Sequence, residues 1–434
     1  METNTDTTST GAAKIAKIDT NVPTGLQKWM LKKTYDAVGC PPIQIQLWNG
    51  AKFGCRNDEV KSKIHVKTRK AFLKLMAYPD LFFGDSYAHG DIVVEGSLVG
   101  FLETFYRGKA NSCKPHLMQR ILDHIVARPH KNNLEGSQEN IHHHYNIGND
   151  FYKLWLDKDL LYTCAYYPTI ESSLEEAQAA KMEHVCRKLH LEPGQTVVEA
   201  GCGWGALAIY MAKNYGVNVK AFNISIEQIK YAQERAKQEG LENQIEFIHD
   251  DYRNVKGEFD AFVSIGMLEH VGTDHYENLG NLIDSCLKES GYGLLHFIGR
   301  NRPMPMNAWI EKRIFPGAYP PSLAEAMQIF ESGQFSVLDV ENLRLHYAKT
   351  LEHWLEKYEQ ESDTIREMFD DEFVNSWRLY LAGSIAAFLI GDLQLFQISF
   401  VNTRNNNIQW TRDFLYSDNK TKTRQEPKWK HVMS

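Results

Sequence analysis

The sequence predicts an α/β fold with a mostly parallel sheet, preceded by a smaller and mainly helical domain. From residue 173 onward, short apolar runs alternate with amphipathic helical runs, which is typical of a parallel sheet covered by helices. Before residue 139, strand-like and helical runs are mixed. A chain of 434 residues is long enough for two or three such units, each with its own core.

Changes in composition divide the chain into four segments. We expect a disordered polar tail over residues 1–19, a first domain over 20–138, a second domain over 139–420 and a polar C-terminal tail over 421–434. The polar stretch 127–140 contains proline and glycine and is predicted to link the two domains.

The first domain mixes two kinds of local pattern. Strand-like runs occupy residues 43–48, 63–68 and 91–97. Helical runs occupy residues 70–78, 98–108 and 116–127. The helical runs are the longer ones, so we expect a mainly helical unit.

The second domain follows a strand–helix alternation. Ser173 is a suitable N-cap for a helix over 173–191, because acidic residues follow it in the first turn. Further helices are expected over 206–216, 226–240 and 276–291, the last closed by Gly291. Strands are expected in the runs 196–200, 218–225, 245–251, 259–266 and 292–299, with a late antiparallel strand at 393–402. In such a sheet, ligands bind at the carboxyl ends of the parallel strands.

Charge and cysteine usage limit the possible surroundings. Residues 1–140 hold 19 Lys and Arg against 14 Asp and Glu, whereas the rest holds 29 against 41. Five of the basic residues fall in KSKIHVKTRK (61–70), ahead of an apolar run. This cluster is either a solvated helix face or a contact with an anionic bilayer surface. No aromatic-interleaved basic repeat points to nucleic acid.

Several features favour the cytoplasm. The polar N-terminus METNTDTTSTGAAK lacks the apolar core of a signal peptide, and no run of eighteen apolar residues indicates a membrane span. The seven cysteines are scattered and form no CxxC pair, which indicates reduced thiols rather than disulfides or a zinc knuckle.

The segment VVEAGCGWG (197–205) indicates a cofactor loop. An apolar strand ends in Glu199 and is followed by three glycines that let the backbone approach a ligand closely. The spacing is G-x-G-x-G rather than the dinucleotide G-x-G-x-x-G, so S-adenosylmethionine is favoured over a pyrophosphate cofactor. The residues expected at this loop are Glu199, Gly201, Cys202, Gly203, Trp204 and Gly205.

Polar residues also follow the next two predicted strands. Asn223, Ile224 and Ser225 would face the ribose of the cofactor, with Gln228 in the following helix. Asp251 and Tyr252 would face the adenine. A structural turn without ligand is the alternative, but three consecutive strand ends with ligand-type residues favour a cofactor site.

Six short segments of the chain occur in a fixed order: LYTCAYY (161–167), VVEAGCGWGALA (197–208), NISIEQ (223–228), DYRN (251–254), GMLEHVG (266–272) and LLHFIG (294–299). Together they resemble the cyclopropane fatty acid synthases, and the resemblance extends from about residue 30 through nearly the whole chain. It implies a class I S-adenosylmethionine-dependent methyltransferase fold (Rossmann-like) preceded by a lipid-binding domain. It also implies that Tyr162 and Thr163 contact the cofactor.

The resemblance also accounts for the histidine triplet in IHHHYNIGNDFYKLWL (141–156). His144, Tyr145 and the Gly148–Asp150 segment match the family, whereas His142 and His143 do not. Histidines that bind zinc are usually spread over i and i+4 or over several elements, so no metal is expected here. The segment is expected to lead a helix that closes over the cofactor.

The family chemistry implies a demanding site. A methyl group passes from S-adenosylmethionine to the cis double bond of a phospholipid acyl chain, and a proton then leaves as the ring closes. An alkene is a weak nucleophile, so the reactants must be held in line. The resulting carbocation must meet no loose water and must have a base nearby.

The resemblance implies that this base is a bound bicarbonate. The matching residues are Cys164, Glu269, His296, Ile298 and Tyr347. Taken singly, Cys164 and Tyr347 are more readily interpreted as core residues, but as a set at family positions they indicate function. Ser384 stands where many family members have a cysteine, and we interpret it as a packing residue because the chemistry needs no covalent enzyme intermediate.

The expected partners follow from the same resemblance. The first domain would extract unsaturated acyl chains from an anionic phospholipid bilayer at the cytoplasmic face of the inner membrane, and a homodimer would present two such surfaces. Two alternatives remain open: a product with a methylene or methyl branch instead of a ring, and an amine N-methyltransferase of the benzylisoquinoline type.

Overall fold

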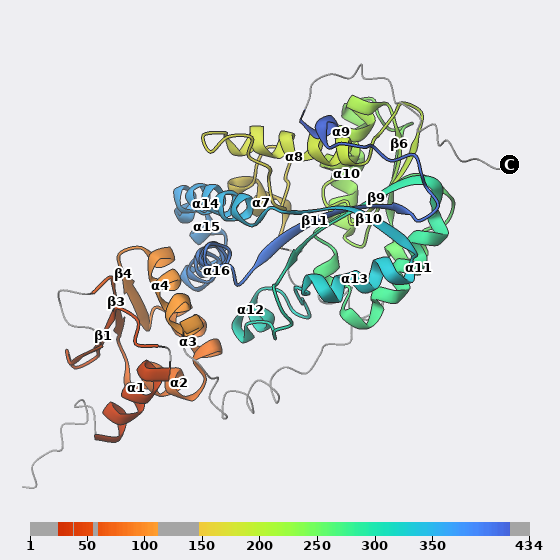
Figure 1. Ribbon diagram of the computed structural model, residues 1–434. Coiled ribbons are helices and arrows are strands. Elements are labelled where there is room, and N and C mark those ends of the chain that lie inside the picture. Colours follow the sequence, from red (N-terminus) through yellow and green to blue (C-terminus); the bar gives the residue numbers. More distant parts are fainter. Residues whose placement is uncertain (1–24, 38, 55–59, 112–146, 417–434) are drawn as a thin grey trace, which may run out of the picture.

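The computed structural model describes residues 25–37, 39–54, 60–111 and 147–416. Figure 1 shows two units: a small N-terminal one at one end of the molecule and a larger one built around a long sheet. A layer of helices, α14 to α16, lies between them. The predicted tails and the linker fall outside the described residues, so those boundaries stay predictions.

The N-terminal unit has a sheet at its centre. The four strands are β1 (Ile43–Leu47), β2 (Lys52–Gly54), β3 (Ser62–Val66) and β4 (Ile92–Glu95), in the order β2-β1-β3-β4. Its helices are α1 (Gly25–Ala37), α2 (Arg69–Ala77), α3 (Pro79–Ala88) and α4 (Leu98–Asn111). The described helices of this unit hold more residues than its strands, but the sheet was not part of the expectation of a mainly helical unit, and Ser62, Ile64 and Val66 of β3 alternate into a core that sheet and helices share.

The large unit contains the predicted sheet. Its strands are β5 (Thr196–Ala200), β6 (Asn218–Asn223), β7 (Ile245–His249), β8 (Phe259–Ile265), β9 (Leu287–Gly299), β10 (Phe335–Asn342) and β11 (Gln394–Asn402). The order is β10-β11-β9-β8-β5-β6-β7. The pairs from β7 to β9 are parallel and β11 is antiparallel, as predicted.

Helices cover both faces of this sheet. One face packs on α8 (Leu174–Lys188), α9 (Ala206–Tyr215) and α10 (Ile226–Gln238), and the other on α11 (Tyr276–Cys286) and α13 (Leu323–Ser332). Neighbouring strand residues such as Val197 and Val198 enter opposite cores, as the two-residue period requires. The predicted cap of α8 is confirmed, because Ser173 and Glu176 form a capping box.

The predicted helix over 276–291 ends earlier than expected. Helix α11 stops at Cys286, and β9 begins at Leu287, which pairs with Phe259 of β8. Gly291 is therefore a strand residue rather than a helix cap. The register shifts beside it, and a Cβ there would lie 2.7 Å from Leu287 Cδ1 and 2.9 and 3.0 Å from the carbonyl oxygens of Lys288 and Asp260, so the irregular strand requires glycine.

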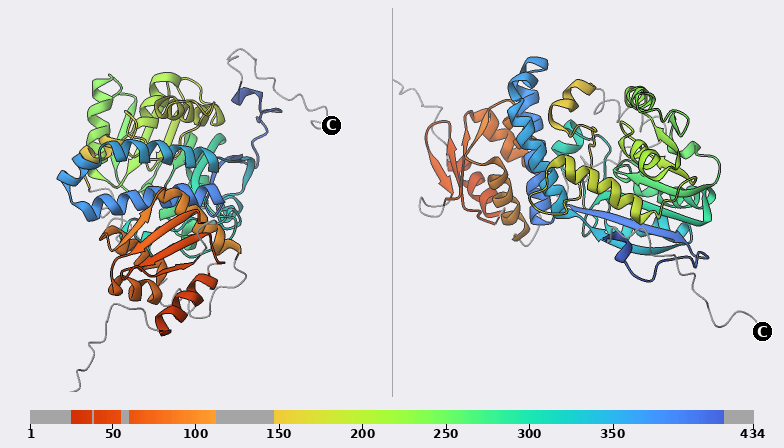
Figure 2. Two further views of the ribbon diagram at one scale, coloured as in Figure 1. Left: turned by 90° about the vertical axis from the view of Figure 1, so that its left-hand side faces the viewer. Right: turned by 90° about the horizontal axis from the view of Figure 1, so that it is seen from above.

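The helical layer joins the two units. It comprises α7 (Asn149–Trp155), α12 (Ala308–Arg313), α14 (Arg344–Gln360), α15 (Ser362–Met368) and α16 (Asp371–Ile390). By length and composition, α16 is the one described helix that is apolar enough to cross a membrane, but half of it is buried in the protein. It packs against α14 on one side and against α3 and α4 on the other (Figure 2). We therefore interpret α16 as a core helix.

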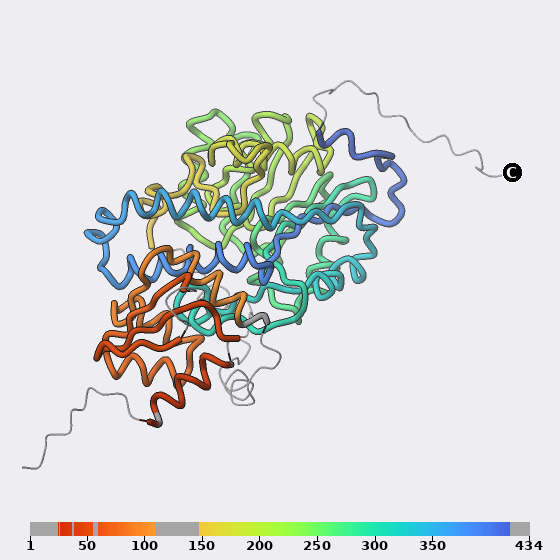
Figure 3. Tube along the Cα trace, turned by 60° about the vertical axis from the view of Figure 1, so that its left-hand side comes forward, coloured from red at the N-terminus to blue at the C-terminus, as the bar shows by residue number. Residues whose placement is uncertain are grey.

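Close packing fixes the N-terminal unit against the large unit, which lies above it and to the right in Figure 3. The Trp309 indole of α12 lies flat on Gly84 of α3, where a Cβ would come within 2.4 Å of the ring. Beside it, Arg313 donates two hydrogen bonds of 3.1 Å to Asp85. The interface thus requires a residue without a side chain at position 84.

We expect Gly84→Ala to lower the free energy of unfolding by about 1–3 kcal/mol, because the added methyl must displace the Trp309 ring. Gly100→Ala is the matched control, since Gly100 also lies in a helix of this unit but has only Ser97 as a neighbour, at 3.4 Å. The control should be neutral or stabilising, because Gly100 is only half-buried and alanine is favoured over glycine within a helix. Thermal unfolding of both variants measures the difference, and equal effects would contradict the role given to Trp309.

Candidate active site

The candidate site lies at the carboxyl ends of β5 to β9, where the chain leaves β5 for one side of the sheet and β8 for the other. Gly201, Gly203 and Gly205 all have positive φ values of 87°, 53° and 81°. At Gly205 a Cβ would collide with Phe247 and Ala232 at under 3 Å, whereas at Gly203 nothing lies within 4 Å. The loop is thus packed tightly underneath and open on the other side, which suits a ligand.

Glu199 provides a buried carboxylate beneath this loop. It is 3% exposed, and its Oε2 has no hydrogen-bond partner among the described residues. Burial raises the pKa of this carboxyl to about 8, while the Lys181 ammonium acts in the opposite direction. A buried acceptor of this kind fits a cationic group of a ligand, such as an ammonium.

The other loop residues form a connected network. Asn223 donates to the Gly203 carbonyl at 3.1 Å and to Gln228 Oε1 at 2.7 Å. Ser225 caps α10, and its backbone N–H donates to Asn223 Oδ1. The neighbouring Ile224 carbonyl accepts from His249 Nε2 at 3.1 Å.

The loop is also tied to the helix that follows the histidine-rich segment. The Trp204 indole N–H donates to Asn149 Oδ1 at 2.8 Å, and Asn149 is the first residue of α7. Cys202 is buried beside it. The predicted helix after Gly148 is thus present and contacts the glycine loop. His142, His143 and His144 lie outside the described residues, so the predicted absence of a metal there stays a prediction.

Asp251 has a local partner that sequence reasoning missed. Its two carboxylate oxygens each accept from the Arg253 guanidinium at 2.8 Å, and it caps the short 3₁₀ turn that begins at Tyr252. The guanidinium also lies over the Tyr252 ring at 5.7 Å. The role of Asp251 and Tyr252 toward an adenine stays a prediction, and Arg253 shares that location.

The segment 161–167 runs between the sheet and the helical layer. The Tyr162 hydroxyl lies 2.8 Å from the Tyr380 hydroxyl of α16, and Thr163 Oγ1 accepts from Lys181 Nζ at 2.9 Å. Cys164 is 1% exposed, and burial raises the pKa of its thiol far above the ordinary value. The thiol is therefore neutral and contributes packing rather than a nucleophile.

Glu269 lies just beyond β8, in a 3₁₀ turn over Leu268–His270. Its Oε1 accepts from the backbone N–H of Ile298 at 2.5 Å, and its buried Oε2 has no partner among the described residues. Burial raises the pKa of the carboxyl to about 7. At neutral pH, Glu269 can thus either accept or donate a proton.

His296 lies on the neighbouring strand, two residues before Ile298. It is 2% exposed, and burial lowers the pKa of its imidazole to about 3, so the ring is neutral. Its Nδ1 lies 3.1 Å from the amide nitrogen of Gln397. With that amide as donor, Nδ1 accepts and the ring proton resides on Nε2, which has no partner among the described residues.

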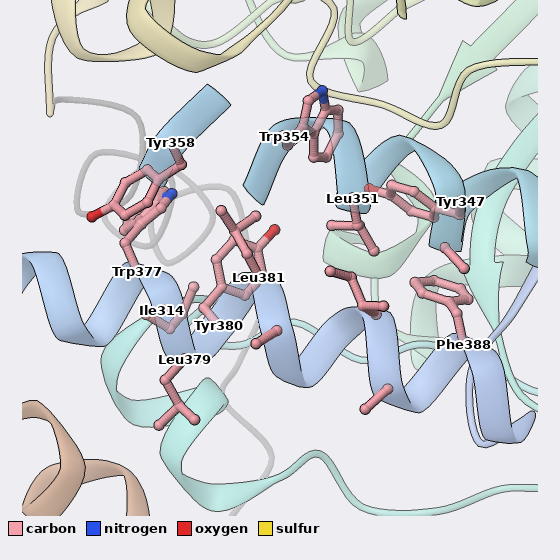
Figure 4. Close-up of a cluster of buried hydrophobic side chains, with 14 of the residues drawn as sticks. Ile314, Tyr347, Leu351, Trp354, Tyr358, Trp377, Leu379, Tyr380, Leu381 and Phe388 are labelled. Atoms are coloured by element: carbon pink, nitrogen blue, oxygen red, sulfur yellow. The ribbon is translucent and has the colours of Figure 1, made fainter. Parts of the chain in front are cut away.

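Tyr347 completes the predicted set from the helical layer (Figure 4). Its ring packs on Phe388 of α16 at 4.8 Å and near Trp354 at 5.9 Å. Tyr347, Cys164 and Ile298 belong to one apolar cluster that also includes the rings of Tyr162 and Trp204. The structure thus joins Glu269 to the backbone of Ile298, with His296 two residues earlier on the same strand. Cys164 and Tyr347 share an apolar cluster with Ile298. That the five residues act as one site stays a prediction.

Two contacts of this site were missing from the sequence interpretation. Gln397 orients His296 from the antiparallel strand β11, and Lys181 contacts Thr163 from α8. For Lys181 a signal existed, because it lies on the same helix face as the apolar Leu174 and Ala177. Ser384 is half-buried in α16, and its interpretation as a packing residue stays a prediction.

Comparisons with known proteins bear on the family and the fold of the chain. The family described as "Mycolic acid cyclopropane synthetase" matches residues 132–398, and a domain of unknown function matches residues 30–116. The cyclopropane-fatty-acyl-phospholipid synthase of Escherichia coli K12 is 34% identical over 360 residues, which is 82% of this chain and 92% of that protein.

Solved structures extend the comparison. A mycolic acid cyclopropane synthase in complex with SAH and CTAB has a TM-score of 0.58 at 30% identity, covering 61% of this chain and 97% of its own. A coclaurine N-methyltransferase has a TM-score of 0.60 over 74% of this chain and 99% of its own, but at 21% identity. That second likeness shows the fold alone.

The raised pKa of Glu269 has a consequence for stability. A carboxyl whose pKa rises from 4.5 to about 7 on folding favours the folded state at low pH, and this contribution is lost as the pH rises through that range. We therefore expect Glu269→Gln to be more stable than the wild type by about 3 kcal/mol at pH 8 and to match it near pH 4. Thermal unfolding at both pH values tests this, and a pH-independent difference would contradict it.

Proposed function

The chain belongs to the family of mycolic acid cyclopropane synthetases and is an S-adenosylmethionine-dependent methyltransferase, and from this premise we propose that it converts cis double bonds of phospholipid acyl chains into cyclopropane rings. One observation above all supports the proposal. Glu269 Oε2 and His296 Nε2 are buried polar atoms without partners among the described residues. Ile298, whose backbone N–H donates to Glu269, packs with its side chain against the apolar cluster. Such a place suits a reaction that needs a base but no water.

The glycine loop and its neighbours would hold S-adenosylmethionine, which supplies the methyl group when bound. Glu199 offers its unpartnered oxygen to the cofactor ammonium. Asn223 and Gln228 form the polar edge after β6, and Asp251 with Tyr252 forms the edge after β7. Tyr162, Thr163 and Trp204 would close the site from the α7 side.

The apolar cluster has two tasks in this proposal. Its aromatic rings exclude water, which would otherwise trap the acyl-chain cation as an alcohol. They also offer a wall along which an acyl chain can lie next to the cofactor. Because Tyr347, Trp354 and Phe388 hold each other in edge and tilted contacts, that wall is rigid.

The unpartnered atoms fit a small anion, and we assign bicarbonate to this position as the proton acceptor. His296 Nε2–H can donate to an oxygen of the anion, and ionised Glu269 can accept its hydroxyl proton. The Tyr347 hydroxyl would donate from the helical layer. The Ile298 N–H donates to Glu269 and so holds that carboxylate in position. Cys164 packs in the site as a neutral thiol.

The N-terminal unit would engage the lipid, on the cytoplasmic face of an anionic bilayer. In the basic cluster 61–70, Lys63 and His65 both pair with Glu95 at 3.1 Å, so they are not available. Lys61, Lys67, Arg69 and Lys70 are exposed, and Leu73 of α2 is exposed beside them. A homodimer would present this surface twice and bind one bilayer with avidity.

We expect a bacterial host that lacks the activity to gain cyclopropane fatty acids when it expresses the chain. Mass spectrometry of fatty acid methyl esters should show the mass of one added CH₂ without a remaining double bond, whereas a branched product would keep the double bond. Glu269→Gln, His296→Ala and Tyr347→Phe should each lower product formation on the order of 10²-fold or more, because each removes a group that holds the base. Ser384→Ala is the control and should retain activity; full activity in all three site variants would refute the assignment of the base.

We expect the purified chain to float with vesicles of anionic lipid at low salt and to be released as salt is raised, because surface contacts between charges are screened. A Lys67→Glu/Lys70→Glu variant should bind more weakly, by about 1 kcal/mol for each lost cation. Lys230→Glu is the control, since Lys230 is exposed on α10 of the large unit. Flotation that is insensitive to salt and to the variant would contradict this surface.

A further inference from the structure

Helix α8 has polar residues on the face that it buries. Its buried positions include the apolar Leu174, Ala177 and Val185, but also Gln178, Lys181, His184 and Lys188, all under 5% exposed. Burying two lysines within one helix is costly unless each has a specific partner. The hydrogen-bond partners of these four side chains therefore indicate which parts of the chain this helix holds in place.

The N-terminal half of this face holds the segment 161–163. Gln178 Nε2 donates to the carbonyls of Leu161 and Thr163 at 3.3 and 3.0 Å. Lys181 Nζ donates to Thr163 Oγ1 at 2.9 Å. On the far side of Thr163, its methyl group lies against Gly266 at the end of β8, where a Cβ would come within 3.1 Å. Thr163 is thus fixed between Lys181 and the strand end that leads to Glu269.

The Lys181 ammonium also acts electrostatically on the buried Asp157 carboxyl, then on the Cys164 thiol, and then on Glu199 at the glycine loop. Lys181 and Glu199 are 1% and 3% exposed, so water does not screen the effect of one charge on the other. Burial lowers the pKa of Lys181 to about 8 and raises that of Glu199 to about 8, while each charge opposes the shift of the other. Removing the ammonium therefore makes it harder to ionise Glu199.

We propose that Lys181 is a positioning residue for the methyl donor: its buried ammonium fixes Thr163 against the strand end at Gly266, and its charge acts on the Glu199 side chain that receives the cofactor ammonium. This inference rests on the cofactor site proposed above. It adds a residue that lies on the helix preceding the glycine loop and acts through two residues that face the cofactor.

The C-terminal half of the same face provides an internal control. Lys188 is buried to 3% and donates to Glu341 of β10 at 2.7 Å, and His184 lies 2.8 Å from the same carboxylate. Neither contact involves the glycine loop or Thr163. Lys188→Met therefore removes an equally buried lysine from the same helix, with a similar effect on folding but a different partner.

The experiment is a titration of the full-length protein with S-adenosylmethionine by isothermal titration calorimetry. Lys181→Met should raise the Kd about tenfold or more, the size expected for losing a hydrogen bond from a charged group. In Lys181→Met the ionisation of Glu199 should require a higher pH than in the wild type, because the ammonium that lowers the pKa of this carboxyl is gone, so the pH dependence of the Kd should move to higher pH. Lys188→Met should leave both the Kd and the pH profile unchanged.

Thr163→Val supplies a second, milder test that keeps the charge. It should raise the Kd by a smaller factor without moving the pH profile. The double variant, Thr163→Val with Lys181→Met, should bind no worse than Lys181→Met alone, because both changes remove the same hydrogen bond. The inference is overturned if Lys181→Met binds within twofold of the wild type, if its pH profile does not move, or if Lys188→Met shows the same loss. Failure of the proposed function would look different, since the unaltered chain would then not bind the cofactor or form the lipid product.

Discussion

Exclusion of water from a site built around ionisable groups is the constraint on which the rest of this structure depends. Glu199, Glu269, His296 and Lys181 are each at most 6% exposed, and burial is the largest cause of the pKa shift in every one of them. The pKa values of Glu199, Glu269 and Lys181 shift to about 7 or 8, near neutral pH. The pKa of His296 falls to about 3, so its imidazole carries no charge. A neutral imidazole and carboxyls that titrate near neutrality can handle a small anion and a cationic cofactor without a permanent unpaired charge in an apolar region.

The two layers of the large unit divide this work. The sheet supplies polar atoms, because its parallel strands end side by side and each is followed by a loop that turns a polar side chain into the same crevice. The helices α14 and α16 supply the apolar cover, with Tyr347, Trp354 and Phe388 packed across their interface (Figure 4). Since α16 also packs on α3 and α4, the cover of the site and the support of the N-terminal unit are the same helix. In the proposed function, lipid engagement and catalysis would therefore share this helix.

Local patterns predicted most of this architecture, and contacts distant in sequence account for what they missed. The strand ends at Glu199, Asn223 and Asp251 follow from alternation and from glycine spacing, both of which are local. Gln397 could not be foreseen as the partner of His296, because 101 residues separate them and only the antiparallel pairing of β11 with β9 brings them together. The interpretation of Gly291 failed for a related reason. A glycine after a helical pattern usually ends a helix, but this one lies in an irregular part of β9, where the carbonyls of Lys288 and of Asp260 on the paired strand both come close.

The polar face of α8 shows how a site can depend on residues that the usual sequence patterns reject. Lysine at a buried helical position is unfavourable for folding, so a helix chosen for stability alone would place an apolar residue there. Here both buried lysines of α8 reach specific acceptors, one at Thr163 and one at Glu341. Thr163 belongs to the segment that also contains Tyr162 and Cys164, and Glu341 lies in the strand that precedes α14, the helix of Tyr347. A single helix therefore binds the segment before Cys164 through one lysine and strand β10 through the other, at a cost in stability that an apolar helix face would avoid.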